Sequence, residues 1–191
     1  MCGIETINIL KYQRLDRIKT FLDNPEANKV YQVMQKYNEY LHTFDSRERN
    51  EFIIHSGAFF QALGTTYTND VDVLVLKHYM NKYDVKNYLK TVDSICKDFD
   101  FNVLANDKNI YTSPTKEPYK YKYLWFTTIL PSLANIDNIY TVISNPKHHF
   151  YFMGMKFFGI KINFAKFLQR SNPSSICDLI MFKTLNNYDL G

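Results

Sequence analysis

Two aspartates separated by one residue, Asp70 and Asp72, are the residues whose type and spacing point most directly to chemistry. Side chains alternate along a strand, so carboxylates at positions i and i+2 point to the same face. Two adjacent carboxylates repel each other and resist desolvation on a buried strand, where Val or Ile would pack better. A hard divalent cation removes this conflict, because it prefers carboxylate oxygens and keeps coordination sites for phosphate and water. We therefore predict that Asp70 and Asp72 are metal ligands and catalytic residues, with Mg²⁺ or Mn²⁺ as the cofactor.

A glycine turn precedes the two aspartates. Residues 51–57 are predicted to form a buried strand that ends in this turn, and residues 58–63 a short helix that Gly64 ends. A glycine between strand and helix lets the backbone approach a phosphate, and the first helical N–H groups point towards it. The turn is therefore predicted to bind a nucleoside triphosphate such as ATP. The predicted nucleotide-binding residues of this part of the chain are Ser56, Gly57, Ala58 and Asn69.

Hydrophobic periodicity predicts the elements that position this site. The segment 24–26, Asn-Pro-Glu, is typical of a helix start, and the polar segment 46–50 is predicted to be a break. We predict an α/β (α+β) fold with a small mixed sheet flanked by helices. Residues 1–45 would form a helical segment packed on the core of residues 46–191, in one compact unit. Predicted strands cover 51–57, 71–76, 101–104, 121–129 and 139–144, residues 112–118 form a loop, and predicted helices cover about 7–22, 30–44, 58–63, 84–99, 150–167 and 175–185.

The last predicted helices carry spaced polar residues. Phe150 to Phe167 repeat at steps of three and four, which predicts a helix with an aromatic core face. Lys156, Asn163 and Arg170 follow at intervals of seven, on one stripe beside that face. Two interpretations stay open. The stripe pairs with phosphates, which makes Lys156 and Arg170 nucleotide-binding residues, or it is the solvated boundary of an amphipathic helix.

These features resemble a known family. Gly57, a short helix, a loop and then Asp70-Val71-Asp72 are similar to the signature of the polymerase-beta-type nucleotidyltransferase superfamily. Lys156, Arg170 and Asp178 are similar to the closing helices of its abortive-infection and LicD-like branches, so the resemblance covers roughly residues 50–185. It implies a nucleotidyltransferase fold. It also implies magnesium-dependent transfer of a nucleoside monophosphate to an acceptor hydroxyl on a protein, a nucleic acid or a small molecule.

The chain departs from the family pattern at two places. Ala58 stands where the family has Gly or Ser, and the predicted strand 121–129 contains no Asp or Glu to serve as the third carboxylate. The alternative function is therefore a catalytically inactive nucleotidyltransferase-fold protein, acting as a nucleotide-binding or interaction module. A further alternative is a virus- or defence-associated interaction protein without a nucleotide site, for which a partner protein is expected.

Composition narrows the class of protein. Hydrophobic residues make up 46% of the 191 residues and charged residues 22%, which is enough for a globular core. The net charge of +4 mildly favours a polyanionic partner. No apolar run approaches the roughly 20 residues needed to span a bilayer, so no membrane partner is expected. Three widely separated cysteines do not favour a disulfide framework. We therefore predict a cytoplasmic location, which for a viral protein would be the cytosol of the host cell.

Other candidate sites have weaker support. The opening Met1-Cys2-Gly3 is similar to the start of glutamine amidotransferases, but a helical pattern follows and the chain contains no Asn-Gly pair. His148 and His149 lack a third metal ligand nearby in the sequence. For His55, which faces away from Ile54 beside the turn, packing and contact with a nucleotide both remain open.

Overall fold

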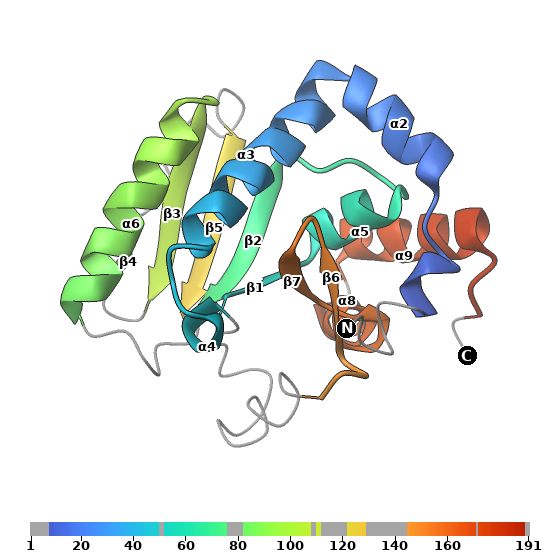
Figure 1. Ribbon diagram of the computed structural model, residues 1–191. Helices are drawn as coiled ribbons and strands as arrows, with labels where there is room; N and C mark the ends of the chain where they lie inside the picture. The colour runs from blue at the N-terminus through green and yellow to red at the C-terminus, as the bar shows by residue number, and fades with distance from the viewer. Residues whose placement is uncertain are drawn as a thin grey trace.

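The chain forms a mixed α/β structure around one sheet (Figure 1). The computed structural model describes residues 8–49, 52–75, 82–107, 110–111, 122–128, 145–170 and 172–189, with the backbone alone at some of these positions. Within these ranges seven strands form a sheet of order β4-β3-β5-β2-β1-β7-β6. The predicted strand 139–144 and loop 112–118, and Cys2, lie outside the described residues. The predicted α/β class is confirmed.

The sheet is mixed in direction. β1 (Phe52–His55) pairs antiparallel with β2 (Asp70–Val75) and parallel with β7 (Met155–Phe158). β5 (Lys122–Thr128) lies parallel to β2 on one side and to β3 (Phe101–Asp107) on the other. The two edges are hairpins, in which β3 pairs with β4 (Ile110–Tyr111) and β7 with β6 (His149–Phe152). The strand with the two aspartates therefore lies in the interior of the sheet.

Two helices form in the N-terminal segment as predicted and end close to the predicted positions, but their starts differ from the predicted positions 7 and 30. α2 spans Leu15–Asp23, and α3 spans Pro25–Leu41. The Asn24 side chain accepts hydrogen bonds from the N–H groups of Glu26 and Ala27, with Pro25 in the first turn, as the segment 24–26 predicted. The expected break at 46–50 is wrong in part, because α4 (Ser46–Arg49) forms a short helix there.

The central elements follow the sequence pattern. α5 spans Gly57–Leu63 and ends at Gly64, whose φ of +75° satisfies the left-handed C-cap. α6 (Lys82–Lys97) connects β2 to β3. Both helices begin one or two residues before the predicted positions, which is the ordinary uncertainty of a helix end.

The C-terminal third differs from the expectation. Residues 150–158 are not helical: β6 and β7 form a hairpin, and only α8 (Ile160–Arg170) is a helix in this range. Met153 and Gly154 make the two-residue turn with φ values of +52° and +75°, the mirror-image geometry that suits hairpins. Phe150 and Phe157 are cross-strand partners on one face, so their spacing of seven imitates a helical repeat. α9 (Pro173–Asn186), capped by Asn172, is the predicted closing helix.

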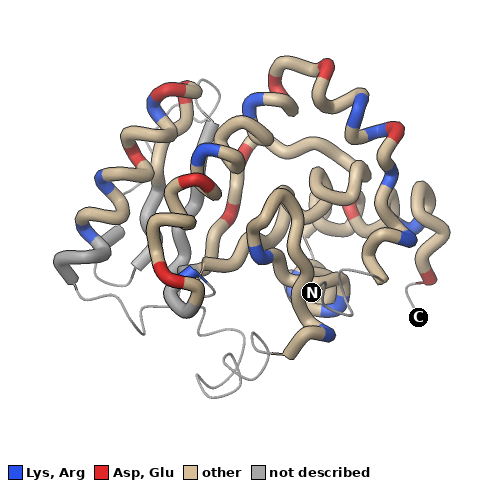
Figure 2. Tube along the Cα trace, viewed as in Figure 1, with Lys and Arg blue, Asp and Glu red and all other residues tan. Residues whose placement is uncertain are grey.

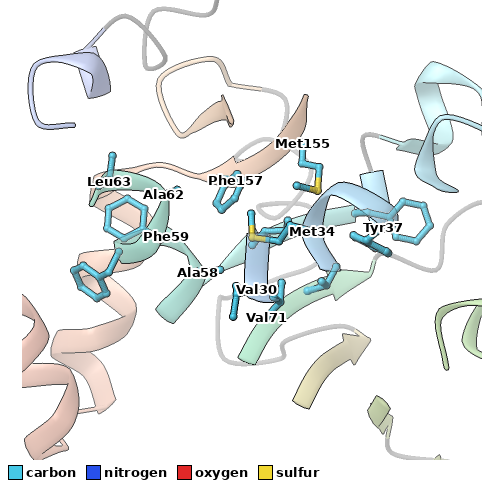
Figure 3. Close-up of a cluster of buried hydrophobic side chains, with 14 of the residues drawn as sticks. Val30, Met34, Tyr37, Ala58, Phe59, Ala62, Leu63, Val71, Met155 and Phe157 are labelled. Atoms are coloured by element: carbon cyan, nitrogen blue, oxygen red, sulfur yellow. The ribbon is translucent and has the colours of Figure 1, made fainter. Parts of the chain in front are cut away.

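Helices α3 and α6 lie side by side over one face of the sheet (Figure 1). Val71 of β2 and Phe157 of β7 pack there against Val30 and Met34 of α3 (Figure 3). Ile54 of β1, the register partner of Phe157, belongs to the same buried cluster. A second group of aromatic side chains joins α5, α8 and α9: Phe59, Phe60, Phe164, Phe167 and Phe182. The core thus covers one face of the sheet, whereas the other face of β1 and β2 carries the buried apolar pair Ile53 and Leu74 together with the polar residues His55, Asp70 and Asp72.

The charged residues are mixed in sign. Figure 2 shows Lys/Arg and Asp/Glu interspersed along α2, α3 and α6 in the described part of the chain. No helix among the described residues combines the length and the apolar character that crossing a bilayer requires.

Candidate functional site

Strand register brings Asp70, Asp72 and His55 to one face of the sheet. His55 is the direct partner of Asp72 in the antiparallel β1–β2 pair, and Asp70 follows at the same face two residues earlier. Val71 and Val73, which alternate with the aspartates, are fully buried in the core beneath α3 and α6. Both aspartates are half-buried. The predicted common orientation of the two carboxylates is therefore observed.

The turn between β1 and α5 is made by Ser56 rather than by Gly57. Ser56 has φ +62° and ψ −130°, a region that glycine adopts readily and that costs other residues about 1–3 kcal/mol. Its backbone N–H donates to the Asn163 side-chain oxygen at 3.0 Å. Gly57 is required for space instead, since a Cβ there would lie 2.5 Å from the Thr68 hydroxyl and 3.8 Å from Asp70 Oδ1. The turn thus lies directly against the first aspartate.

Buried and partly buried hydrogen bonds hold the segment that leads into β2. The Thr68 hydroxyl donates to Asp70 Oδ1 at 2.9 Å. The Gln61 side chain, which is fully buried, accepts from the Thr68 N–H at 2.8 Å and donates to the Ala27 carbonyl at 2.8 Å. Asn69, between these residues, is exposed. Gln61 therefore connects α3, α5 and the segment that carries the first aspartate, and it fixes their relative positions.

A buried lysine lies beneath the turn. Lys166 of α8 is 7% exposed, and its ammonium lies 2.5 Å from His55 Nδ1 and 3.1 Å from the Ser56 hydroxyl. The ammonium can only donate, so Nδ1 accepts and the neutral ring carries its proton on Nε2. Ser56 Oγ lies 2.7 Å from the same nitrogen. His55 is therefore packed in the interior, as one of the two interpretations predicted, and it lies beside Asp72, while its contact with a nucleotide stays a prediction.

Asn163 and Lys166 are neighbours on the inner face of α8. Asn163 is 1% exposed, and it also donates to the carbonyls of Phe158 and Gly159. The sequence interpretation noted Asn163 but overlooked Lys166. The available signal was the spacing of three between two polar residues in an aromatic helix, because positions i and i+3 share a face.

Of the two predicted phosphate-binding cations, Lys156 is not at this turn, and the Arg170 side chain is not described. Lys156 was expected on the same helical stripe as Asn163 and Arg170, but it lies in β7, because the aromatic repeat is a hairpin. Arg170 is the last residue of α8, and its side chain is outside the described part. Ala58, the second residue of α5, is fully buried in the core, so its side chain has no direct access to a ligand. The cation observed at the turn is Lys166.

The neighbouring strand supplies no acid. In the parallel β2–β5 register Asp70 pairs with Tyr123 and Asp72 with Trp125. Among the described residues no group of three or more His, Cys, Asp or Glu side chains is placed to hold a metal ion. The two carboxylates of β2 fit two positions of a Mg²⁺ shell, since Mg²⁺ is commonly bound by one or two carboxylates with water and phosphate completing the octahedron.

The fold and the site define a mixed α/β chain with two aspartates beside a strained strand-to-helix turn. Comparison with known proteins adds no relative: no family model matches the chain, and no curated protein and no solved structure matches it.

Proposed function

We propose that the chain is a magnesium-dependent nucleotidyltransferase that moves a nucleoside monophosphate from a triphosphate to an acceptor hydroxyl. The observation that carries the proposal is the placement of Asp70 and Asp72 on one sheet face, against the Ser56–Gly57 turn. The strain at Ser56 supports it, because strained backbone persists where the surroundings enforce it and gathers at functional sites.

Each residue of the site would have a distinct role in this transfer. Asp70 and Asp72 would hold Mg²⁺, which would supply positive charge beside the phosphates. The Gly57 backbone lies close to the phosphates, and the buried Lys166 ammonium beneath Ser56 adds positive charge at the turn. The acceptor oxygen bonds to the α-phosphorus as the bond to the bridging oxygen breaks. Pyrophosphate leaves, and the acceptor proton passes to solvent.

Release of pyrophosphate from each of the four nucleoside triphosphates, with Mg²⁺ or Mn²⁺, tests this proposal. Asp70→Asn and Asp72→Asn should each reduce the rate at least about 100-fold, a loss of roughly 3 kcal/mol in transition-state stabilisation. Asp23→Asn, at an exposed position at the end of α2, is the matched control and should retain the rate. A rate unchanged by both substitutions on β2 would contradict the proposed site.

A second candidate function is supported by the β5 register. Tyr123 and Trp125 occupy the positions that pair with the two aspartates, where a third carboxylate would assist proton removal or bind a second metal ion. A nucleotide-binding module without turnover would show metal-dependent binding of ATP and a raised unfolding temperature, but no pyrophosphate. An unfolding temperature that no triphosphate changes would instead favour an interaction protein without a nucleotide site.

A further inference from the structure

A second polar site lies at one edge of the sheet, in the β6–β7 hairpin. A cavity of about 250 Å³ opens between the end of α3, α4 and this hairpin. It is lined by Asn38, Leu41, Ser46, Arg49, Tyr151, Gly154, Met155 and Lys156. Asp70, Asp72, His55 and Lys166 are not in its wall, and β1 separates its strand from β2.

Lys156 is the unusual residue of this cavity. It is 6% exposed, and within the described part of the chain its ammonium has no hydrogen-bond or ion-pair partner. A buried cation without a partner is costly, so such groups normally pair or bind a ligand. Burial alone lowers the pKa of Lys156 to about 8, which still leaves it mostly protonated at neutral pH. The ammonium therefore brings positive charge to a cavity wall.

Three further groups of the wall suit an anion. The half-buried Arg49 guanidinium of α4 brings a second positive charge, and it acts electrostatically on the Tyr151 hydroxyl. Tyr151 is the cross-strand partner of Lys156, so the two side chains lie on the same face of the hairpin. Ser46 adds a hydroxyl from the start of α4. No acidic residue lines the cavity among the described residues.

We propose that this cavity is an anion site, separate from the aspartates, that binds the phosphate group of a small phosphomonoester. Phosphate matches the donor set, because a guanidinium, an ammonium and hydroxyls can bind its several oxygens at once. A volume of about 250 Å³ leaves room for a small organic group beyond the phosphate. The site does not require the proposed nucleotidyl transfer.

Thermal unfolding and calorimetry with two probes, inorganic phosphate and ribose 5-phosphate, test this site. Wild-type protein should bind one equivalent of the probe without added metal. Lys156→Met and Arg49→Gln should each weaken the binding of the probe by about tenfold or more. Lys161→Met, at an exposed position of α8, is the matched control and should bind as wild type does. Tighter binding of the ester than of phosphate identifies a phosphomonoester as the ligand, and equal binding assigns the site to free phosphate.

The two proposals fail differently. Binding of phosphate should survive Asp70→Asn and Asp72→Asn, which abolish nucleotidyl transfer. Phosphate binding of unchanged affinity in Lys156→Met would overturn the anion site. The anion site would also be overturned if chloride raised the unfolding temperature as much as phosphate does at the same ionic strength, because that response is only general screening of charges.

Discussion

Two lysines, ten residues apart and equally buried, belong to regions that differ in how their polar groups are satisfied. Lys166 lies beneath the β1–α5 turn and contacts His55 and Ser56. Lys156 lies in the hairpin and has no partner in the described residues, only a cavity. Burial of a charge therefore does not by itself define its role. A lysine with partners holds a turn in place, whereas one beside a cavity is available to a ligand.

The largest effect on stability is expected at Lys166, the lysine whose ammonium has hydrogen-bond partners. Lys166→Met removes the donor to two buried acceptors, His55 Nδ1 and Ser56 Oγ, and should lower the free energy of unfolding by about 3 kcal/mol. Urea unfolding measures this change. Lys161→Met on the exposed face of the same helix should change it by less than about 0.5 kcal/mol. Equal effects of the two substitutions would show that Lys166 does not stabilise the turn.

The next effect concerns the space beside Asp70. Gly57→Ala places a Cβ 2.5 Å from the Thr68 hydroxyl and should destabilise the protein by about 2 kcal/mol. It should also weaken metal binding, because Thr68 donates to Asp70. Adding Thr68→Ala removes the hydroxyl and leaves only the Thr68 Cβ at 3.0 Å, so it should recover part of the stability, but not the metal affinity. A harmless Gly57→Ala would contradict the close approach.

Substitution of Lys156, the lysine without a partner in the described residues, should change the free energy of unfolding in the opposite direction. Lys156→Met removes a buried charge and keeps the apolar stem, so it should raise the free energy of unfolding by about 1 kcal/mol at pH 7. The pKa of Lys156 falls from 10.5 to about 8 on folding, so its protonated form opposes folding, and this cost is present in full below pH 8. The cost declines as pH rises from 8 towards 10.5. The advantage of the variant, measured by urea unfolding, should shrink over that range.

The smallest effect is the pH dependence of phosphate binding. Affinity should decline as pH rises through about 8, because Lys156 then loses its proton. Burial raises the pKa of Tyr151, so this hydroxyl does not produce the decline. Calorimetry at pH 7 and pH 9 measures the ratio of affinities. In Lys156→Met the remaining binding should be nearly independent of pH in this range.

The sequence predicted several element ends and the strand of the two aspartates well, because the signals for these features are local. Asn24, Gly64 and the Asp-Val-Asp alternation each determine structure within a few residues. The hairpin was mistaken for a helix, because cross-strand pairing of Phe150 with Phe157 imitates a period of seven. The contacts of Lys166 with His55 and Ser56 join residues 110 and more positions apart, and no local pattern contains them. The strain at Ser56 also depends on tertiary packing, and a serine there gives no sign of it.

Binding of Mn²⁺, followed by electron paramagnetic resonance in the presence of ATP, tests the metal site most directly. Wild-type protein should bind Mn²⁺ together with the nucleotide, and Asp70→Asn with Asp72→Asn should reduce its affinity by about tenfold or more, while the unfolding temperature without metal does not fall. The same affinity in wild type and in the double variant would show that the two carboxylates on β2 hold no metal ion.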